Sequence, residues 1–403
     1  MALLPRPYSE LRSLCVTLLL GSSLGCSYVH VPTPEDGMII ARTMELSGGP
    51  LHFFSLAANA PIEARGDPSL PWMVAAHRRG ENQGQMAAHA CPGVEPWVSK
   101  YGYVSIDVRA NVSGLDAGAI ASDGMNEKGL TISGHTLRQA DYQLPASDKA
   151  RNVCWLSFNS WVLANFDSVQ SLRASLASTH IVGAIVPLPD SAGIHWAVDD
   201  ATGASIVIEV IDGVLNVHNN SVGTFTNDPD FRWHLRNLNN YAFLTPGWTA
   251  QDKEVTVQSE VGVLPRAIGH GLNLRGLPGD ISPPSRFIRL FYLRQYAMLK
   301  SPPTSLNESI AVATGLLNGV FIVKGTVSEP DPQSEQFEFT QYSLLKLPAK
   351  RQLFYRDYVN GQWHRIRLDD LDFSPLKGGQ TGESFELIDG TAGFVDVTDR
   401  LQR

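Results

Sequence analysis

Short runs of β-favouring residues recur along most of this chain, and segments with helical spacing interrupt them. Apolar residues alternate with a period of two in the first kind of run and return every three or four residues in the second. The expected strands lie at 26–30, 38–44, 97–106, 215–218, 339–345, 352–356 and 363–368, with one more after a turn within 122–134 and two, separated by a turn, within 195–210. The expected helices are 153–165, 168–176, one opened by Pro229 and one ending near Leu299. This order predicts an α+β fold, with two antiparallel sheets covered by helices.

The first 25 residues have the pattern of a removable signal peptide. Arg6 and Arg12 precede an apolar run at 14–20, and small residues follow as far as Gly25. A cut after Gly25 leaves residues 26–403 as one mature domain of 378 residues, since 403 less 25 is 378. We therefore expect an exported protein, periplasmic or secreted in a bacterium and lumenal in a eukaryotic cell.

The mature chain would begin with Cys26, a residue that carries a nucleophile and a base together. The freed α-amine titrates at about 7.7–8.0 and can take the proton of a thiol that titrates near 8.5. Three other interpretations remain open: a half-cystine, an inert buried thiol, and a lipoprotein cysteine anchored to a membrane. In the last of these the amine is acylated and cannot act as a base.

The remaining cysteines are few. Cys15 leaves with the signal peptide, so Cys26, Cys91 and Cys154 form an odd set in an oxidising compartment, and we expect one free thiol. Cys91 and Cys154 could pair, but the sequence does not give the distance between their α-carbons. The chain has no CxxC and no HExxH pattern, so neither a metal site nor a cofactor is indicated.

Charge and hydropathy exclude several classes of protein. The net charge is −8, and no basic stripe is present, which argues against a nucleic-acid partner. After the signal peptide no stretch approaches the ~20 apolar residues of a membrane span. A composition of 43% hydrophobic and 18% charged residues is that of a globular protein.

We expect the first two strands to form a hairpin. The segment at 31–37 between them contains two prolines, an aspartate and a glycine, residues that favour turns. Such a hairpin returns Arg42 to the side of Cys26. A fixed cation there lowers the pKa of the thiol and favours the thiolate.

Six short motifs occur in the order found in one known family, and the sequence resembles the choloylglycine hydrolase family, which includes penicillin V acylases, conjugated bile salt hydrolases and acid amidases. The resemblance covers nearly all of the mature chain. The motifs are Cys26 with Ala41-Arg42-Thr43-Met44-Glu45, Trp97-Val98-Ser99-Lys100-Tyr101-Gly102, Asp123-Gly124-Met125-Asn126-Glu127-Lys128-Gly129-Leu130, Thr226-Asn227-Asp228-Pro229, Gly276-Leu277-Pro278-Gly279-Asp280 with Ser285-Arg286-Phe287, and Thr340-Gln341-Tyr342-Ser343.

This resemblance implies an N-terminal-nucleophile hydrolase with a four-layer αββα sandwich. Its substrate would be a linear, non-peptide amide: penicillin V, a bile salt, an acyl-homoserine lactone or an N-acyl amine. Cys26 would be the nucleophile, with Arg42 beside it and Arg286 completing the polar cluster. The side chain of Asn227 and the backbone N–H of Thr136 would hold the oxyanion. The resemblance implies no cofactor and a possible homo-oligomer, a tetramer in relatives.

Glu45 departs from the family pattern, which has aspartate at the position that orients the free amine of the cysteine. Glutamate keeps the charge but is one methylene longer, and a displacement of about 1 Å can cost roughly a hundredfold in rate. A slower enzyme, a compensated site, and a catalytically impaired binding protein of the same fold are the three hypotheses that follow.

The acyl group of such substrates is apolar, so its pocket should be apolar as well. Phe53, Phe54, Met73 and Leu137 are candidates for its wall by their position alone. The substrate-binding residues and the acyl group itself remain undetermined at this level.

Overall fold

The computed structural model describes residues 25–35, 37–47, 72–112, 115–183, 193–245, 257–259, 262–264, 274–328, 337–375 and 384–387. The predicted signal peptide, apart from Gly25, lies outside these residues. So do Phe53 and Phe54, two of the candidates for the pocket wall.

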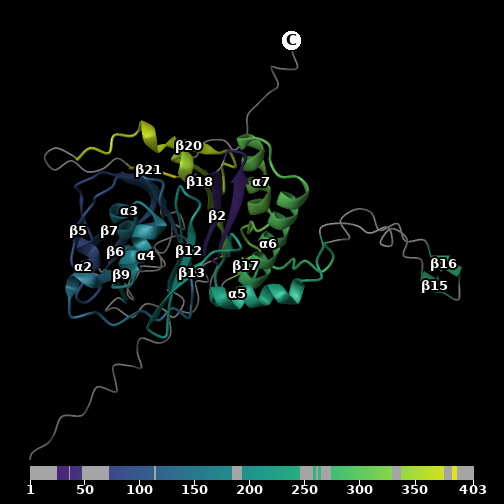
Figure 1. Cartoon of the computed structure of the whole chain (residues 1–403), viewed down its shortest axis with the longest axis horizontal. Helices are drawn as coiled ribbons and strands as arrows, with labels where there is room; N and C mark the ends of the chain where they lie inside the picture. The colour runs from purple at the N-terminus through teal and green to yellow at the C-terminus, as the bar shows by residue number, and fades with distance from the viewer. Residues whose placement is uncertain are drawn as a thin grey trace, which may run out of the picture.

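Two antiparallel sheets form the centre of the fold (Figure 1). The first contains, in spatial order, β14 (Thr224–Phe225), β1 (Cys26–Thr33), β2 (Gly37–Ser47), β18 (Phe337–Leu347), β19 (Gln352–Asp357) and β20 (His364–Arg367), with β17 (Val327–Ser328) paired to β18. The second contains β13 (Val214–Asn219), β12 (Ser205–Ile211), β11 (Ile194–Asp199), β8 (Thr131–Thr136), β7 (Leu115–Asn126), β6 (Tyr103–Val112), β3 (Met73–His77) and β21 (Ser384–Glu386).

Helices cover the outer face of each sheet, which gives the four layers αββα that the sequence led us to expect (Figure 1). The helices α6 (Pro283–Lys300) and α7 (Leu306–Asn318) pack on β1, and α7 also packs on β2. On the other side α3 (Phe158–Asn165) packs on β7 and β8. The remaining elements are α2 (Gln85–Ala90), α4 (Val169–Leu176), α5 (Phe231–Asn237), β4 (Asn82–Gln83), β5 (Trp97–Val98), β9 (Asn152–Cys154), β10 (His180–Val182), β15 (Val257–Ser259), β16 (Gly262–Leu264) and short 3-10 turns.

Two of the expected helix starts are wrong. Residues 152–154 form β9, which pairs in parallel with β10, and the α-helix expected from Val153 begins only at Phe158. The strand partner, which is distant in sequence, overrides the local helical spacing. Pro229 does not open a helix either: it follows a cis peptide bond, and Asp230 is the N-cap of α5.

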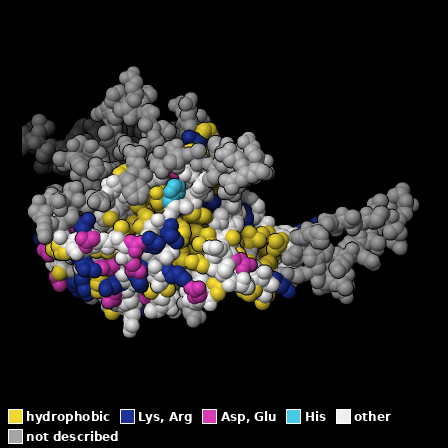
Figure 2. All heavy atoms as spheres, turned by 90° about the horizontal axis from the view of Figure 1, so that it is seen from above, with side chains coloured by type: hydrophobic (Ala, Val, Ile, Leu, Met, Phe, Trp, Pro, Cys, Tyr) yellow, Lys and Arg dark blue, Asp and Glu magenta, His cyan; other side chains and the backbone are white. Residues whose placement is uncertain are grey.

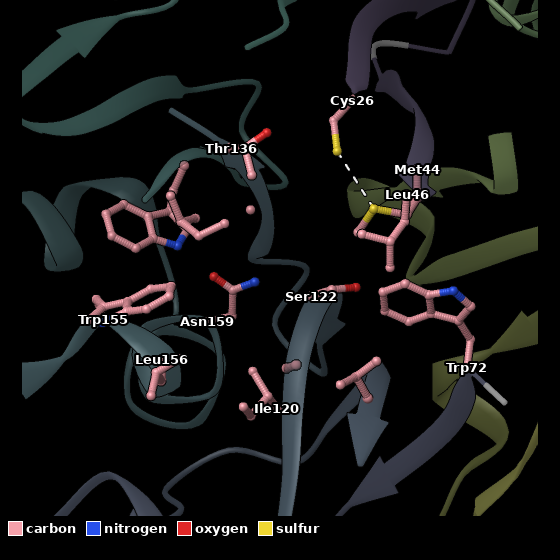
Figure 3. A pocket seen from close by; sticks show the side chains of 15 residues that line it. Cys26, Met44, Leu46, Trp72, Ile120, Ser122, Thr136, Trp155, Leu156 and Asn159 are labelled. Atoms are coloured by element: carbon pink, nitrogen blue, oxygen red, sulfur yellow. Dashed lines mark hydrogen bonds between the residues drawn. The ribbon is translucent and has the colours of Figure 1, made fainter. Parts of the chain in front are cut away.

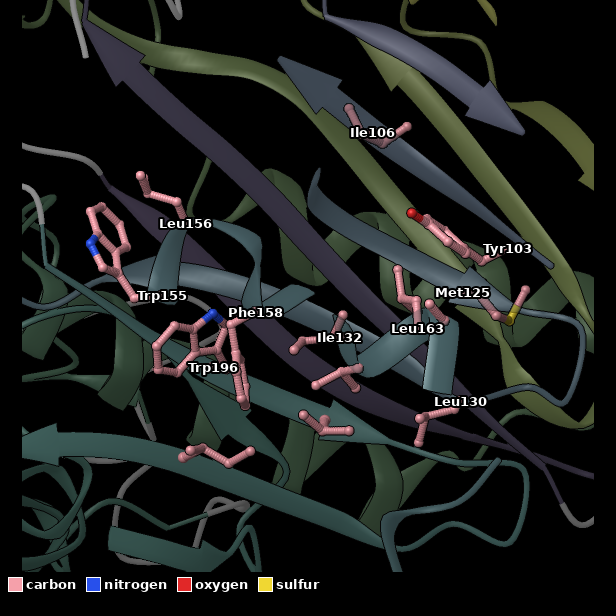
Figure 4. Close-up of a cluster of buried hydrophobic side chains, with 14 of the residues drawn as sticks. Tyr103, Ile106, Met125, Leu130, Ile132, Trp155, Leu156, Phe158, Leu163 and Trp196 are labelled. Atoms are coloured by element: carbon pink, nitrogen blue, oxygen red, sulfur yellow. The ribbon is translucent and has the colours of Figure 1, made fainter. Parts of the chain in front are cut away.

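Alternate residues of strand β1 pack against two different layers of the fold. Val29 and Val31 face α6 and α7 within one apolar cluster, whereas Tyr28 belongs to another cluster, with residues of β11 and β12. Successive strand residues point to opposite faces, so Cys26 lies on the same face as Tyr28, between the two sheets. The largest cluster fills this space and extends to α3 (Figure 4).

The predicted hairpin of β1 and β2 is confirmed. Cys26 pairs with Met44, and Tyr28 pairs with Arg42. Both Arg42 and Met44 therefore share the inter-sheet face with Cys26, whereas Glu45 lies on the opposite face, toward α6.

A bulge in β18 lets that strand serve both faces at this point. Thr340 pairs with Glu45 and Tyr342 pairs with Met44, so Gln341 is the extra residue. In a regular strand Thr340 and Tyr342 would point to the same face, and the extra residue places them on opposite faces. Thr340 thereby reaches Glu45, and Tyr342 points between the sheets toward Arg42.

Cys91 and Cys154 form a disulfide, with their α-carbons 5.6 Å apart. Cys26 is a free, buried cysteine. The bond ties the segment after α2 to the end of β9, immediately before Trp155. The prediction of one free thiol is thus confirmed within the described residues, and the question of the pair is answered.

The outer surface carries charges of both signs. On the described part of the face in Figure 2, Lys and Arg side chains are intermingled with Asp and Glu side chains and with hydrophobic ones. Within the described ranges, no helix combines the length and the apolar character needed to cross a membrane.

Candidate active site

Cys26 lies at the start of β1, and its side chain is 1% exposed. Its thiol is 3.6 Å from the sulfur of Met44. Burial raises the pKa of the thiol, and the nearby charge of Arg42 opposes that effect. Ionisation of the thiol in this site therefore depends more on neighbouring cations than ionisation of a thiol in water does.

Arg42 is the cation nearest to that thiol. Its Nη2 donates to the Cys26 sulfur at 3.5 Å and to the Gly134 carbonyl oxygen at 2.7 Å. Its Nη1 donates to the Tyr342 hydroxyl at 2.9 Å and lies 3.2 Å from a carboxylate oxygen of Asp123. Four fixed partners hold this planar group in one orientation.

A second buried cation shares Asp123 with Arg42, a feature that sequence reasoning missed. The Lys346 Nζ donates to Asp123 at 2.5 Å and to the Ser133 hydroxyl at 2.7 Å. All of these side chains are buried. One carboxylate thus faces two cations, so the positive charge of Arg42 is only partly neutralised. Asp123 lies within a motif quoted above, but no local signal singles out Lys346.

Asn227 connects the Cys26 backbone with strand β8. Its Oδ1 accepts from the Cys26 backbone nitrogen at 2.6 Å, and its Nδ2 donates to the Thr136 hydroxyl at 2.9 Å and to the Thr136 carbonyl at 3.2 Å. The N–H of the next residue, Leu137, already donates to the Gly193 carbonyl oxygen at 2.8 Å. The predicted oxyanion residues Asn227 and Thr136 are therefore adjacent.

Arg286, near the start of α6, binds the same backbone from the helical side. Its Nη1 donates to the Cys26 carbonyl and to the Ser27 hydroxyl, each at 2.7 Å, and its Nη2 donates to Asn227 Oδ1 at 2.9 Å. Since Oδ1 accepts from both Arg286 and Cys26, the amide of Asn227 can only present its N–H groups toward Thr136.

Glu45 is buried beneath the Gly25–Cys26 bond. Its backbone N–H donates to the Gly25 carbonyl at 2.8 Å, and its Oε1 accepts from the Thr340 hydroxyl at 2.7 Å. Its other carboxylate oxygen has no hydrogen-bond partner among the described residues. Residue 25 has little room, because a β-carbon there would lie 2.1 Å from Glu338 Oε1. Removal of Gly25 would thus open a space lined by acidic side chains next to the new α-amine.

The carboxyl group of Glu45 should make stability depend on pH. Burial raises its pKa from 4.5 to about 7, so the folded chain holds a proton that the unfolded chain has already released. This contribution to stability is complete below pH 4.5 and is lost as the pH rises through 7. For a chain that retains Gly25, we expect the free energy of unfolding to fall by about 3 kcal/mol over this interval, since one pKa unit is worth about 1.4 kcal/mol.

Denaturant titrations at several pH values measure this change, and a Glu45→Gln variant is the control. The variant should lack the decrease between pH 4.5 and 7. An equal slope in the variant would contradict the assignment to Glu45.

Beside Cys26 lies a mostly apolar pocket between the two sheets (Figure 3). Three tryptophans line it, and its wall comes from β1, β2, β6, β7, β8, β11 and the segment at 155–159. The lining residues are Cys26, Met44, Leu46, Trp72, Val108, Ile120, Ala121, Ser122, Gly134, Thr136, Trp155, Leu156, Asn159, Ile194 and Trp196.

The predicted apolar pocket is present, but the residues chosen for its wall are wrong where the structure tests them. Neither Met73 nor Leu137 lines it. Leu137 is fully buried, and it points away from the face that Thr136 presents to the pocket. Trp155 and Trp196 line the pocket instead. Trp155 follows β9 and Trp196 lies on β11, and no local sequence pattern indicates that these two elements meet.

Comparison with known proteins gives a consistent result. A family model described as "Linear amide C-N hydrolases, choloylglycine hydrolase family" matches residues 96–387. A bile salt hydrolase/transferase of Clostridium perfringens is 34% identical over 266 residues, which cover 64% of this chain and 75% of that protein. A penicillin V acylase of Pectobacterium atrosepticum is 31% identical over 152 residues, 36% of this chain and 39% of that protein.

Solved structures are similar over most of the chain. A mutant of the conjugated bile acid hydrolase from Clostridium perfringens has a TM-score of 0.70 at 25% identity, covering 93% of this chain and 100% of that one. Penicillin V acylase from Agrobacterium tumefaciens has a TM-score of 0.61 at 19% identity, covering 89% and 90% of the two chains. The second likeness concerns the fold alone.

Proposed function

This chain belongs to the choloylglycine hydrolase family of linear amide C–N hydrolases, and we propose that it hydrolyses an N-acyl amide with Cys26 as an N-terminal nucleophile. The observation that carries the proposal is the arrangement around Cys26. Its thiol opens on an apolar pocket and lies 3.5 Å from Arg42, and its backbone nitrogen is 2.6 Å from Asn227.

Removal of residues 1–25 turns that backbone nitrogen into a free α-amine. The amine takes the proton of the thiol, and the sulfur attacks the carbonyl carbon of the substrate. Arg42 stabilises the thiolate. The protonated amine then gives its proton to the nitrogen of the leaving group, the C–N bond breaks, and an S-acyl enzyme remains. Water hydrolyses this thioester and restores the thiol.

The tetrahedral intermediate carries negative charge on the former carbonyl oxygen. The side-chain N–H of Asn227 and the backbone N–H of Thr136 are the proposed donors, and a well-placed donor of this kind is worth about 2.7–4 kcal/mol. Arg286 keeps the amide of Asn227 in the required orientation. The oxyanion would compete with the Thr136 side chain for the Asn227 N–H groups.

The acyl group of the substrate would occupy the tryptophan-lined pocket. Relatives are named for bile salts and for penicillin V, and both names fit a bulky apolar acyl group. For this chain we propose the broader class of linear amides with an apolar acyl group. The Cys91–Cys154 disulfide supports export, because such bonds persist in oxidising compartments.

The position of Cys26 also bears on the two other hypotheses. A lipidated thiol must reach a membrane, whereas this side chain is 1% exposed and points between the sheets; its burial therefore favours the hydrolase. An impaired binding protein would keep the pocket but misplace Glu45. A substitution at Glu45 distinguishes such a protein from an active hydrolase.

The proposal is tested by the intact mass and the N-terminal residue of the exported protein, followed by a panel of acyl amides. A chain beginning at unmodified Cys26 that hydrolyses members of the panel is the expected result. A lipid mass on Cys26, or a stable start at another residue, would remove the base and overturn the mechanism.

We expect Glu45→Asp to lower kcat, by up to about a hundredfold, because the shorter side chain withdraws from the Thr340 hydroxyl that now binds it at 2.7 Å. Thr340→Val is the companion variant, since it removes the same hydrogen bond and keeps Glu45; thermal unfolding corrects for the second bond that it removes, from the Ile322 N–H to the Thr340 hydroxyl at 2.9 Å. Steady-state kinetics should show a loss of kcat in both. A large rise in the aspartate variant would instead identify the native site as impaired.

A further inference from the structure

Asn159 is a polar residue in the apolar pocket whose bonding is incomplete. It belongs to α3, is 5% exposed and lines the pocket. Its Oδ1 is buried and has no hydrogen-bond partner among the described residues. The other two polar side chains of the wall differ: Ser122 is bonded to the Tyr342 hydroxyl at 2.7 Å, and Thr136 to Asn227 at 2.9 Å.

An unsatisfied amide is costly in such surroundings. Nearly all buried polar groups in folded proteins are hydrogen-bonded, and each exception requires an explanation. The neighbouring wall residues Trp155, Leu156 and Trp196 are apolar, so a leucine of similar size would suit the site better as packing alone. The amide is therefore suited to a partner that the free chain lacks.

The location of the amide connects it with the reacting centre. Its Nδ2 lies beside β8, 3.3 Å from the position that a β-carbon on Gly134 would take. The carbonyl of the same Gly134 anchors Arg42 at 2.7 Å. In Figure 3 the amide of Asn159 is turned into the pocket, between the walls that carry Trp155 and Ser122. A group bound by Asn159 thus shares the pocket with the thiol of Cys26.

We propose that Asn159 forms a polar subsite of the acyl pocket that selects acyl groups carrying a hydroxyl group over plain hydrocarbon chains. The inference rests on the proposed function, because it concerns the substrate of the same site. A hydroxyl group donates to the unpartnered Oδ1 and can also accept from the Asn159 N–H.

The substrate atom that Asn159 binds should be uncharged, for an electrostatic reason. A carboxylate in this apolar wall would need a cation, and the nearest ones are already engaged. Arg42 is held by Tyr342 and Asp123, and Arg286 by Asn227. Burial of an unpaired charge is far more costly than burial of a bonded neutral oxygen.

The test uses decanoyl 4-nitroanilide and its 3-hydroxy, 7-hydroxy and 9-hydroxy analogues, in which one hydroxyl group replaces one hydrogen. We expect one oxygen position to raise kcat/KM about 10- to 100-fold over decanoyl in the wild-type protein, a typical gain for one matched buried hydrogen bond. In Asn159→Leu this preference should fall to about 1. The variant should also unfold at a higher temperature, because it removes an unsatisfied buried amide.

Leu156→Ala is the matched control, since it alters the same wall without changing a polar group. It should affect all four substrates in parallel. A wild-type protein that prefers decanoyl over every analogue would overturn the subsite and leave the proposed function intact. An oxygen preference that survives in Asn159→Leu would overturn it equally.

A binding measurement separates failure of the subsite from failure of catalysis. In a Cys26→Ala protein, the corresponding primary amides can be titrated by quenching of tryptophan fluorescence, because tryptophans line the pocket. The same oxygen preference, abolished by Asn159→Leu, is expected there. Equal affinities for all four amides would refute the subsite even if no anilide is hydrolysed.

Discussion

Replacing Cys26 by alanine is expected to lower kcat by about a millionfold, the scale on which removal of a nucleophile acts in other covalent hydrolases. The thiol beside Arg42 is the proposed nucleophile, and within the described residues Cys26 is the free cysteine. The backbone contacts of residue 26 with Asn227 and Arg286 do not involve the side chain. The fold should therefore persist while the chemistry stops.

Kinetics on the best amide of the panel measure this loss, and thermal unfolding checks that the variant is folded. Cys26→Ser is the companion variant, because it keeps the size of the side chain and the free α-amine but exchanges the nucleophilic atom. It should also be inactive or nearly so. An alanine variant that retains a substantial fraction of kcat would refute Cys26 as the nucleophile.

Replacing Arg42 by methionine is expected to raise the pKa of the Cys26 thiol by at least about one unit and to lower kcat/KM by a hundredfold or more. Burial already raises this pKa, and the charge of Arg42 is the largest opposing effect. Each unit leaves about tenfold less thiolate at a pH below the pKa. The pH dependence of Cys26 alkylation by iodoacetamide measures the change directly, without reference to any substrate.

Lys346→Met provides the matched control for Arg42. Both residues are fully buried cations on Asp123, and removal of either leaves that carboxylate with one partner. Loss of one member of a buried ion pair costs about 3–5 kcal/mol of stability, so both variants should be destabilised. Only Arg42 contacts the thiol, at 3.5 Å, so the alkylation profile should move much further in Arg42→Met. Equal shifts in both variants would contradict a specific role for Arg42.

Much of the local structure could be predicted from the sequence. The turn between Thr33 and Gly37 lies within the segment 31–37 that the sequence indicates and places β1 against β2. The alternation along β1 separates the residues that face the helices from those that face the second sheet. A hairpin needs only neighbouring residues, so its register follows from its turn. Arg42 was found beside Cys26 for this reason.

The other predicted site residues came from motifs and not from local physics. Asn227 and Arg286 lie 201 and 260 positions from Cys26 in the chain, and both contact its backbone. No periodicity in the sequence could predict these contacts. Asn227 and Arg286 were predicted from the resemblance to a family. The structure brings the other five predicted residues, Arg42, Glu45, Thr136, Asn227 and Arg286, together near Cys26, while their catalytic roles are proposals.

Long-range packing alone decided the rest. The bulge at Gln341 aims Thr340 and Tyr342 at opposite faces, Lys346 meets Asp123 across the two sheets, and β10 draws residues 152–154 into a strand. The pocket, with Asn159 in its wall, forms where side chains from both sheets and α3 converge. A pattern of alternation states which side chains are buried but not which partners they meet, because the partners lie on other strands. By itself, therefore, the sequence determined most of the strands and the first hairpin with Cys26 at its start, and the tertiary structure decided the charge around that cysteine and the shape of its pocket.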